Sequence, residues 1–196
     1  MLRAALALLT APAFLAVAPG SAPDAPAGGP AAQIDRACAG DVDRALSSDP
    51  LAFARIYGHD AHGEWHPLDA TTKVRIARDP DIYSEVAQAW RVENKIVLVQ
   101  ITARSLDFWA GASYCFRRSG TLARVMESSS GTEVRDDESR YFDERGTVVA
   151  SRSQFYALTP SAMATISPDF KPSTPTLYLT VHDLPFLEGV VSNDRG

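Results

Sequence analysis

Three of the four histidines in this chain lie in the stretch Tyr57–Asp69. They are His59, His62 and His66, and acidic residues stand between them. Zinc takes three or four nitrogen, sulfur or oxygen ligands, and histidine together with aspartate or glutamate can supply all of them. His59, His62 and His66 are therefore the candidate metal ligands of this sequence.

The spacing of these histidines does not favour a shared metal ion. A helix would place them on one face, but Gly58, Gly63 and Pro67 oppose a continuous helix. On an extended strand, His62 and His66 would share a face but stand too far apart to meet one ion. The stretch also lacks the HExxH spacing of zinc hydrolases. We expect a connector between helices and sheet, with no metal or other cofactor.

A further catalytic candidate is His182, which precedes Asp183 near the C-terminus. A general base needs a partner within hydrogen-bond reach, and a metal-assisted hydrolase would combine His182 with the Tyr57–Asp69 stretch. No nucleophile motif supports such an enzyme, because the sequence GASYC has Cys115 where the GxSxG elbow requires glycine. The sequence therefore favours a protein without catalytic activity, and the hydrolase is kept as the alternative.

Two adjacent aromatic residues are the first binding candidates. Phe108 and Trp109 lie in LDFWAG, which reads as a loop. The aromatic residues of this region are expected mostly to form the core between sheet and helix. Two large aromatic side chains in a loop are difficult to bury together, however, so the alternative is that one of them is exposed as a contact site. In the histidine-rich connector, Trp65 is the expected buried anchor.

Arginines on neighbouring predicted strands are the second binding candidates. Acidic residues at 136–138 favour cross-strand ion pairs on a solvated face, which would account for both sets of charges. The alternative is that Arg124, Arg140 and Arg152 line a sheet face that receives an anionic ligand.

The N-terminus has the layout of a secretory signal peptide. Arg3 precedes an apolar run, Ala4–Val17, and small residues and prolines follow. The run is shorter than the roughly 20 apolar residues that a membrane-spanning helix needs. We expect a signal peptide over 1–27, a flexible leader over 28–32 and a mature chain that does not span the membrane. The protein would be periplasmic or extracellular.

The chain has two cysteines, Cys38 and Cys115, and both lie in the part expected to be exported. In an oxidising compartment such a pair is most simply a disulfide. The net charge of −5 comes without a lysine-rich run, which argues against nucleic acid as a partner. A small molecule or another protein remains as the expected partner.

The first half of the mature chain has helical signals. Apolar residues recur at spacings of three and four over 33–48, which predicts an amphipathic helix. Asp49 and Pro50 then have the types favoured at a helix start. They predict a second helix over LAFARIYG, ending at Gly58.

Three hairpin turns organise the second half. WRVENKI, FRRSGTL and FDERGTV each have an aromatic residue followed four residues later by Asn94, Gly120 or Gly146. Glycine, and asparagine more readily than most residues, accepts the positive φ of a hairpin turn. The strands that follow from these turns are approximately 84–92, 96–104, 112–118, 121–129, 133–142 and 147–158. TLYLTVHDL, near the C-terminus, is a candidate for one more strand.

These elements predict an α+β domain over 33–185, in which N-terminal helices pack on a curved antiparallel β-meander of about six strands. A loose tail is expected over 186–196. The favoured function is a non-catalytic module that binds a ligand or protein through the sheet face or the Phe108–Trp109 loop. A structural accessory of the cell envelope is the third possibility.

Overall fold

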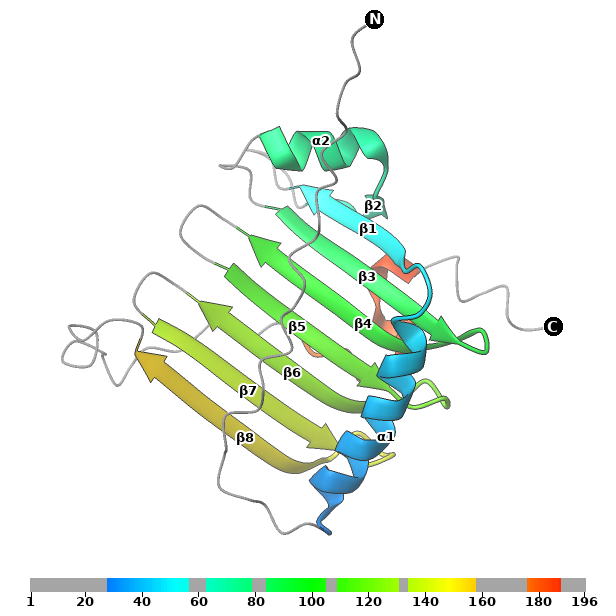
Figure 1. Cartoon of the computed structure of the whole chain (residues 1–196), viewed down its shortest axis with the longest axis vertical. Helices are drawn as coiled ribbons and strands as arrows, with labels where there is room; N and C mark the ends of the chain where they lie inside the picture. Colours follow the sequence, from blue (N-terminus) through cyan, green and yellow to red (C-terminus); the bar gives the residue numbers. More distant parts are fainter. Residues whose placement is uncertain are drawn as a thin grey trace, which may run out of the picture.

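The computed structural model describes residues 28–56, 63–78, 84–104, 109–130, 134–157 and 176–187. Its main feature is one eight-stranded antiparallel sheet in the order β2-β1-β3-β4-β5-β6-β7-β8 (Figure 1). The strands are β1 Leu51–Ile56, β2 His66–Pro67, β3 Ser84–Val92, β4 Lys95–Arg104, β5 Trp109–Phe116, β6 Leu122–Ser130, β7 Val134–Phe142 and β8 Val148–Ala157. The helices are α1 Pro30–Ala45 and α2 Ala70–Arg78, and two 3-10 turns follow, η1 Val181–Asp183 and η2 Pro185–Leu187.

The antiparallel sheet and two helices fit the α+β class, but the sheet has eight strands where about six were expected. The expected second helix is wrong, because Leu51–Ile56 forms strand β1 and pairs with β3. Phe53 and Ala54, which point to opposite faces, are both buried. A strand covered on both faces reads as a continuous apolar run, so its period does not distinguish it from a helix. The second helix is instead α2, beyond the β1 edge of the sheet (Figure 1).

The three predicted hairpin turns are confirmed. Asn94, Gly120 and Gly146 have φ angles of 63°, 86° and 80°. The two glycine turns share one hydrogen-bond pattern: Gly120 N–H donates to the Arg117 carbonyl oxygen and Gly146 N–H to that of Asp143. These turns join β3 to β4, β5 to β6 and β7 to β8, and the predicted strand bounds agree with the observed ones to within a few residues.

One face of the sheet carries α1 (Figure 1). The predicted disulfide is present, joining Cys38 of α1 to Cys115 of β5 with an S–S distance of 2.10 Å. Cys115 is the cross-strand partner of Arg124 in β6, and partners in an antiparallel pair share a face. We call this side the helix face. α1 begins at Pro30, inside the segment expected to be a leader, and the predicted signal peptide lies outside the described residues.

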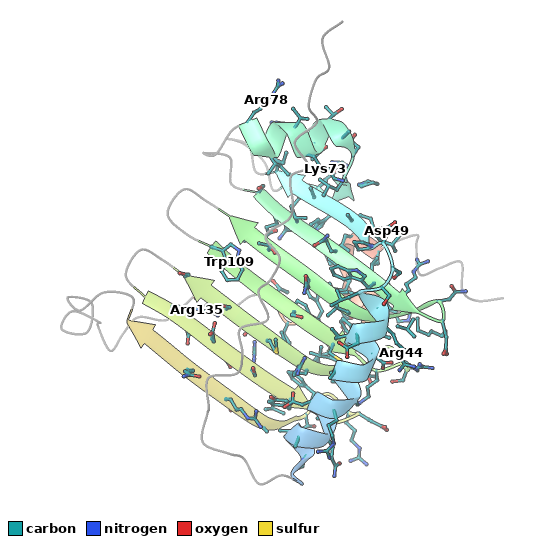
Figure 2. The ribbon with its side chains drawn as sticks, viewed as in Figure 1. Arg44, Asp49, Lys73, Arg78, Trp109 and Arg135 are labelled. Carbon is teal, nitrogen blue, oxygen red and sulfur yellow. A yellow bond between two sulfur atoms is a disulfide. The ribbon has the colours of Figure 1, made fainter. Side chains whose placement is uncertain are left out.

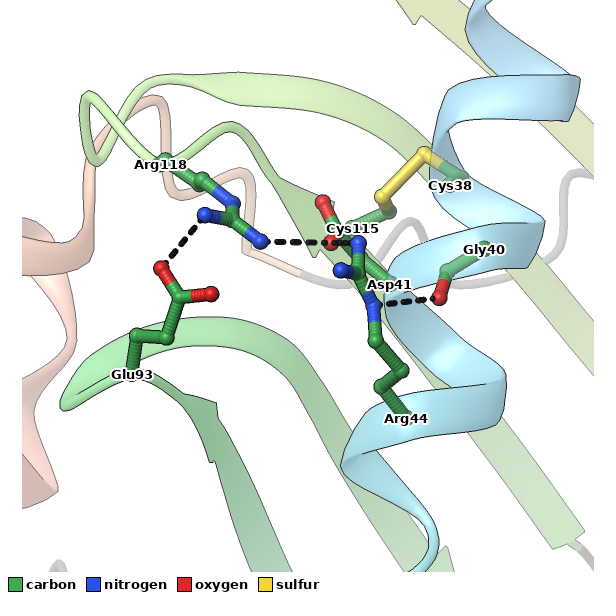
Figure 3. Close-up of polar contacts among 7 residues, drawn as sticks. All are labelled: Cys38, Gly40, Asp41, Arg44, Glu93, Cys115 and Arg118. Carbon is green, nitrogen blue, oxygen red and sulfur yellow. Dashed lines mark hydrogen bonds and ion pairs between the residues drawn. A yellow bond between two sulfur atoms is a disulfide. The ribbon is translucent and has the colours of Figure 1, made fainter.

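Ion pairs tie α1 to two of the hairpin turns near the disulfide (Figure 3). Asp41 of α1 is 2.5 Å from an arginine of its own helix, Arg44, and 3.7 Å from Arg118 in the β5–β6 turn. Arg118 also contacts Glu93 of the β3–β4 turn at 2.6 Å. α1 is therefore held at the turn end of the sheet by charge as well as by the disulfide.

The other face, which we call the core face, is covered in part by residues 177–187 (Figure 1). Val181, Leu184, Phe186 and Leu187 are buried there against the sheet. The expected extra strand is limited to one bridge, between residues 121 and 180. The core extends to Leu187, inside the segment expected to be a loose tail, and residues 188–196 lie outside the described part of the chain.

The expected anchor of the histidine-rich connector also packs on the core face. Trp65 is partly buried, and its ring centroid lies 5.0 Å from that of Phe186. Within the described ranges, no helix has the length and apolarity needed to cross a membrane.

Candidate functional site

Of the three predicted metal ligands, one lies in the described part of the chain. His59 and His62 lie outside the described residues, and His66 is exposed in the two-residue strand β2. In the described part of the chain, no three histidine, cysteine or acidic side chains are placed to hold a metal ion together. His182 is exposed in η1.

One residue of the predicted aromatic pair lies in the described part of the chain, and it belongs to a strand. Trp109 is the first residue of β5, and Phe108 lies outside the described residues. The indole of Trp109 lies over Gly111, because a Cβ atom at that position would be 2.8 Å from the ring. Only glycine leaves room for this contact. Trp109 projects from the helix face, away from α1 and at the opposite end of the sheet (Figure 2).

The three predicted arginines divide between the two faces. Arg124 and Arg152 are on the helix face, where both approach Asp35 of α1 at 2.6 Å and 3.7 Å. Tyr141 Oη donates a hydrogen bond to the same carboxylate at 3.2 Å. These two arginines therefore anchor α1. Arg140 is on the core face, so the three do not form one anion-binding surface.

Arg140 belongs to a cluster of charges whose buried member, Glu127, was not predicted from the sequence. We call this the acidic cluster: Glu127 of β6 with Asp136, Glu138 and Arg140 of β7. Glu127 and Glu138 are cross-strand partners. Arg140 Nη2 donates to Glu127 Oε2 at 2.7 Å, and Arg140 Nε is 3.4 Å from Glu138 Oε1. The pair between Arg140 and Glu127 is the best-formed contact of the cluster.

Glu127 is the unusual member, because it is only 8 % exposed. Its Oε1 atom is buried and has no hydrogen-bond partner among the described residues. Leaving a buried polar group unsatisfied costs about 1–3 kcal/mol, and more when the group is charged. The salt bridge with Arg140 satisfies the Oε2 atom of Glu127. The buried Oε1 atom is not satisfied by it.

The surroundings raise the pKa of two of these carboxyl groups. Burial raises the pKa of Glu127, and the hydrogen bond from Arg140 opposes that rise in part. Burial, followed by the charges of Glu138 and Asp137, raises the pKa of Asp136. Titratable groups with perturbed pKa values gather at functional sites more often than elsewhere, although structural ion pairs also perturb them.

A buried tyrosine extends the polar region toward the C-terminal segment. Tyr114 of β5 shares the core face, and its Oη donates to the Thr176 carbonyl oxygen at 2.9 Å. Burial and the nearby charge of Glu127 raise its pKa. The phenol is therefore neutral at physiological pH, and it borders the acidic cluster on the side of the apolar core.

Strand alternation is the signal that could have identified Glu127. Val125 and Glu127 are two residues apart in β6 and face the same way, and Val125 is fully buried. An acidic residue in the inward register of a strand is rare unless it is paired. To find Glu127 from the sequence, one must know which alternate residues of β6 point inward. The pairing of β6 with β5 and β7 determines that, and the sequence of β6 alone does not.

The cluster places two carboxylates, Glu127 and Glu138, against one arginine. One buried oxygen of Glu127 has no hydrogen-bond partner among the described residues, and that oxygen can accept a hydrogen bond. A carboxyl group with a raised pKa can also take up a proton. Comparisons of the chain with protein-family models, with curated proteins and with solved structures gave no match.

Proposed function

We propose that this protein is a non-catalytic binding domain whose site is the acidic cluster on the core face. The observation that carries the proposal is the buried, unpartnered Oε1 atom of Glu127. A buried acceptor without a partner is destabilising unless something else satisfies it. A ligand that donates a hydrogen bond to Oε1 would satisfy it.

Charge indicates the chemical class of this ligand. With all three carboxyl groups ionised, the acidic cluster has two more negative charges than positive ones, since Arg140 is its one cation. A positively charged donor would offset this excess and form a charge-assisted hydrogen bond, which is stronger than a neutral one. We therefore assign the site to a ligand bearing an ammonium or guanidinium group.

An exported location supports this reading. The disulfide between Cys38 and Cys115 fits an oxidising compartment, and the N-terminal pattern predicts export. The hydrolase built on the histidine-rich stretch and the structural accessory remain alternatives. Neither accounts for the buried carboxylate.

Calorimetry with a small diamine tests the proposal. We expect putrescine to bind the purified protein, and its neutral analogue 1,4-butanediol to show no binding. A hydrogen bond to a charged group contributes about 1.5–3 kcal/mol, and about 1.4 kcal/mol corresponds to a tenfold change in affinity. Glu127→Gln should therefore weaken putrescine binding by about tenfold or more.

Glu144→Gln is the matched control. It makes the same chemical change at an exposed residue of the β7–β8 turn, and should leave the Kd of putrescine unchanged. Equal affinity in both variants, or no binding by the unmodified protein, would overturn the proposal. A circular dichroism spectrum of each variant checks that the fold is intact.

A further inference from the structure

The two edges of the sheet differ in how well they are protected. At one edge, β2 has two residues, and one of them is Pro67, which has no backbone N–H to offer. At the other edge, β8 has ten residues. In the described part of the chain, β7 is the only strand that pairs with it. β8 therefore offers a long row of backbone donors and acceptors on its outer side.

The sequence of β8 also lacks several of the residue types that usually block an exposed edge. Edge strands are commonly protected by proline, lysine, inward-pointing charges or short length. The sequence VVASRSQFYA contains no proline, lysine or acidic residue. Its single charge, Arg152, is directed to Asp35 and lies over the ring of Tyr141. At the start of the strand, Val148 and Val149 are 50 % and 41 % exposed.

We propose that β8 pairs with β8 of a second copy of this chain, antiparallel and across a twofold axis perpendicular to the sheet. Such an axis keeps both helix faces on the same side of the joined sheet. A foreign peptide added to a sheet edge is selected by pockets for its alternate side chains. The residues beside this edge are small or polar and exposed, namely Ser151, Arg152, Ser153 and Gln154. An identical strand needs no such pocket, because across a twofold axis each β8 strand presents the same surface to the other.

Charge selects the register. A twofold axis through Arg152 would place two arginines directly opposite each other, which is destabilising. An axis between two residues would put side chains from opposite faces together. Moving the axis to Ser153 places Arg152 opposite Gln154 and pairs residues 149–157 of both strands. This is the longest register that preserves the faces and avoids opposed arginines.

The acidic clusters do not prevent this pairing. Glu138 is the partner of Ser153 in β7, so the two copies of Glu138 would be three strand spacings apart. At about 4.8 Å per spacing this is roughly 14 Å, well beyond the Debye length of about 8 Å at physiological ionic strength. Repulsion between the clusters is therefore largely screened.

Cysteine crosslinking tests both the partner and the register. Ser153→Cys places two thiols directly opposite each other, within the Cα–Cα range of roughly 4.4–6.8 Å that a disulfide spans. Ser151→Cys is the matched control on the same face of the same strand. Its two copies would be offset by four residues, about 13 Å along the strand. Under mild oxidation we expect Ser153→Cys to give mainly a covalent dimer, and Ser151→Cys to stay mainly monomeric.

Sedimentation velocity of the unmodified protein provides the second readout. We expect a dimer that dissociates on dilution, and we expect Ser153→Lys to weaken it several-fold more than Ser151→Lys, because only the first opposes two lysines. A protein that is monomeric up to about 100 μM, where a dimer with a Kd of about 100 μM or tighter would be seen, overturns the proposal. Equal or greater crosslinking of Ser151→Cys also overturns it.

Discussion

The two faces of the sheet are covered by segments of opposite character. The helix face carries a regular sixteen-residue helix, whose buried residues are Ala31, Cys38 and Ala45. The core face carries residues 177–187, whose regular structure amounts to two 3-10 turns. This irregular segment nevertheless buries four larger apolar side chains. The regular element thus makes the smaller apolar contact.

This difference indicates how each segment is attached. Small side chains give α1 little apolar area to bury, so its attachment depends on the disulfide and on ion pairs such as Asp35–Arg124. Burying an apolar side chain contributes about 1.5–3 kcal/mol, so the C-terminal segment can be held by packing alone. Regular secondary structure is therefore a poor guide to which element contributes most to the core.

Removing the disulfide, which attaches α1, should lower the free energy of unfolding more than any other change considered. Cys38 and Cys115 are 77 residues apart, and the chain-entropy model gives a loss of about 4.5 kcal/mol for opening a loop of that length. The double variant Cys38→Ala/Cys115→Ala should unfold at a correspondingly lower urea concentration. Hydrogen exchange should show loss of protection in α1 while β4 stays protected. A loss below about 1 kcal/mol would mean that packing holds the helix after all.

Truncation in the C-terminal segment should have the next largest effect. Leu184 is 1 % exposed and packs in the main core, so Leu184→Ala should lower the free energy of unfolding by about 3 kcal/mol. Leu179→Ala is the control, since Leu179 is 39 % exposed and should change stability by less than about 1 kcal/mol. Equal losses in the two variants would show that the segment is not held by its buried side chains.

The smallest expected effect is a dependence of stability on pH from the acidic cluster. Because burial raises the pKa of Glu127 in the folded protein above the unperturbed 4.5, the folded state holds this proton more tightly than the unfolded state. The stabilising contribution is present below the unfolded pKa and is lost as pH rises through the folded pKa. Glu127→Gln lacks this contribution.

Urea unfolding of both proteins over a pH series measures that difference. The stability of the unmodified protein relative to Glu127→Gln should be greatest at acid pH and decline as Glu127 ionises. Parallel curves for the two proteins would mean that Glu127 titrates as it does in the unfolded chain.

Local signals predicted the turns, the β3–β8 strands, α1 and the disulfide. Gly120 and Gly146 adopt the positive φ angles that their turns require. A few neighbouring residues are therefore enough to predict each turn. The β1 strand was mistaken for a helix because Asp49 and Pro50 imitate a helix start. The C-terminal cover was predicted as a candidate strand, but it forms one bridge and two 3-10 turns. The burial of its apolar residues depends on where the chain returns to the sheet.

The candidate site was harder to predict for the same reason. Arg140 was identified from the sequence, but its partner Glu127 was not, because the two meet only when β6 pairs with β7. Arg124 and Arg152 were expected beside Arg140. Their register places them on the other face, where both approach Asp35 of the helix α1. The charge of each residue can be read from the sequence. The face of the sheet on which two charged residues meet depends on how the strands pair.

The order of the strands has a consequence for how the protein matures. From β3 to β8, each strand pairs with its neighbour in the chain, so every hairpin can close as soon as its second half is available. α1 precedes all of these strands and must wait for β5 before Cys38 can meet Cys115. Since the chain has two cysteines, no wrong intramolecular pairing is available during that interval. Oxidative maturation would therefore need an oxidant but no step of disulfide isomerisation.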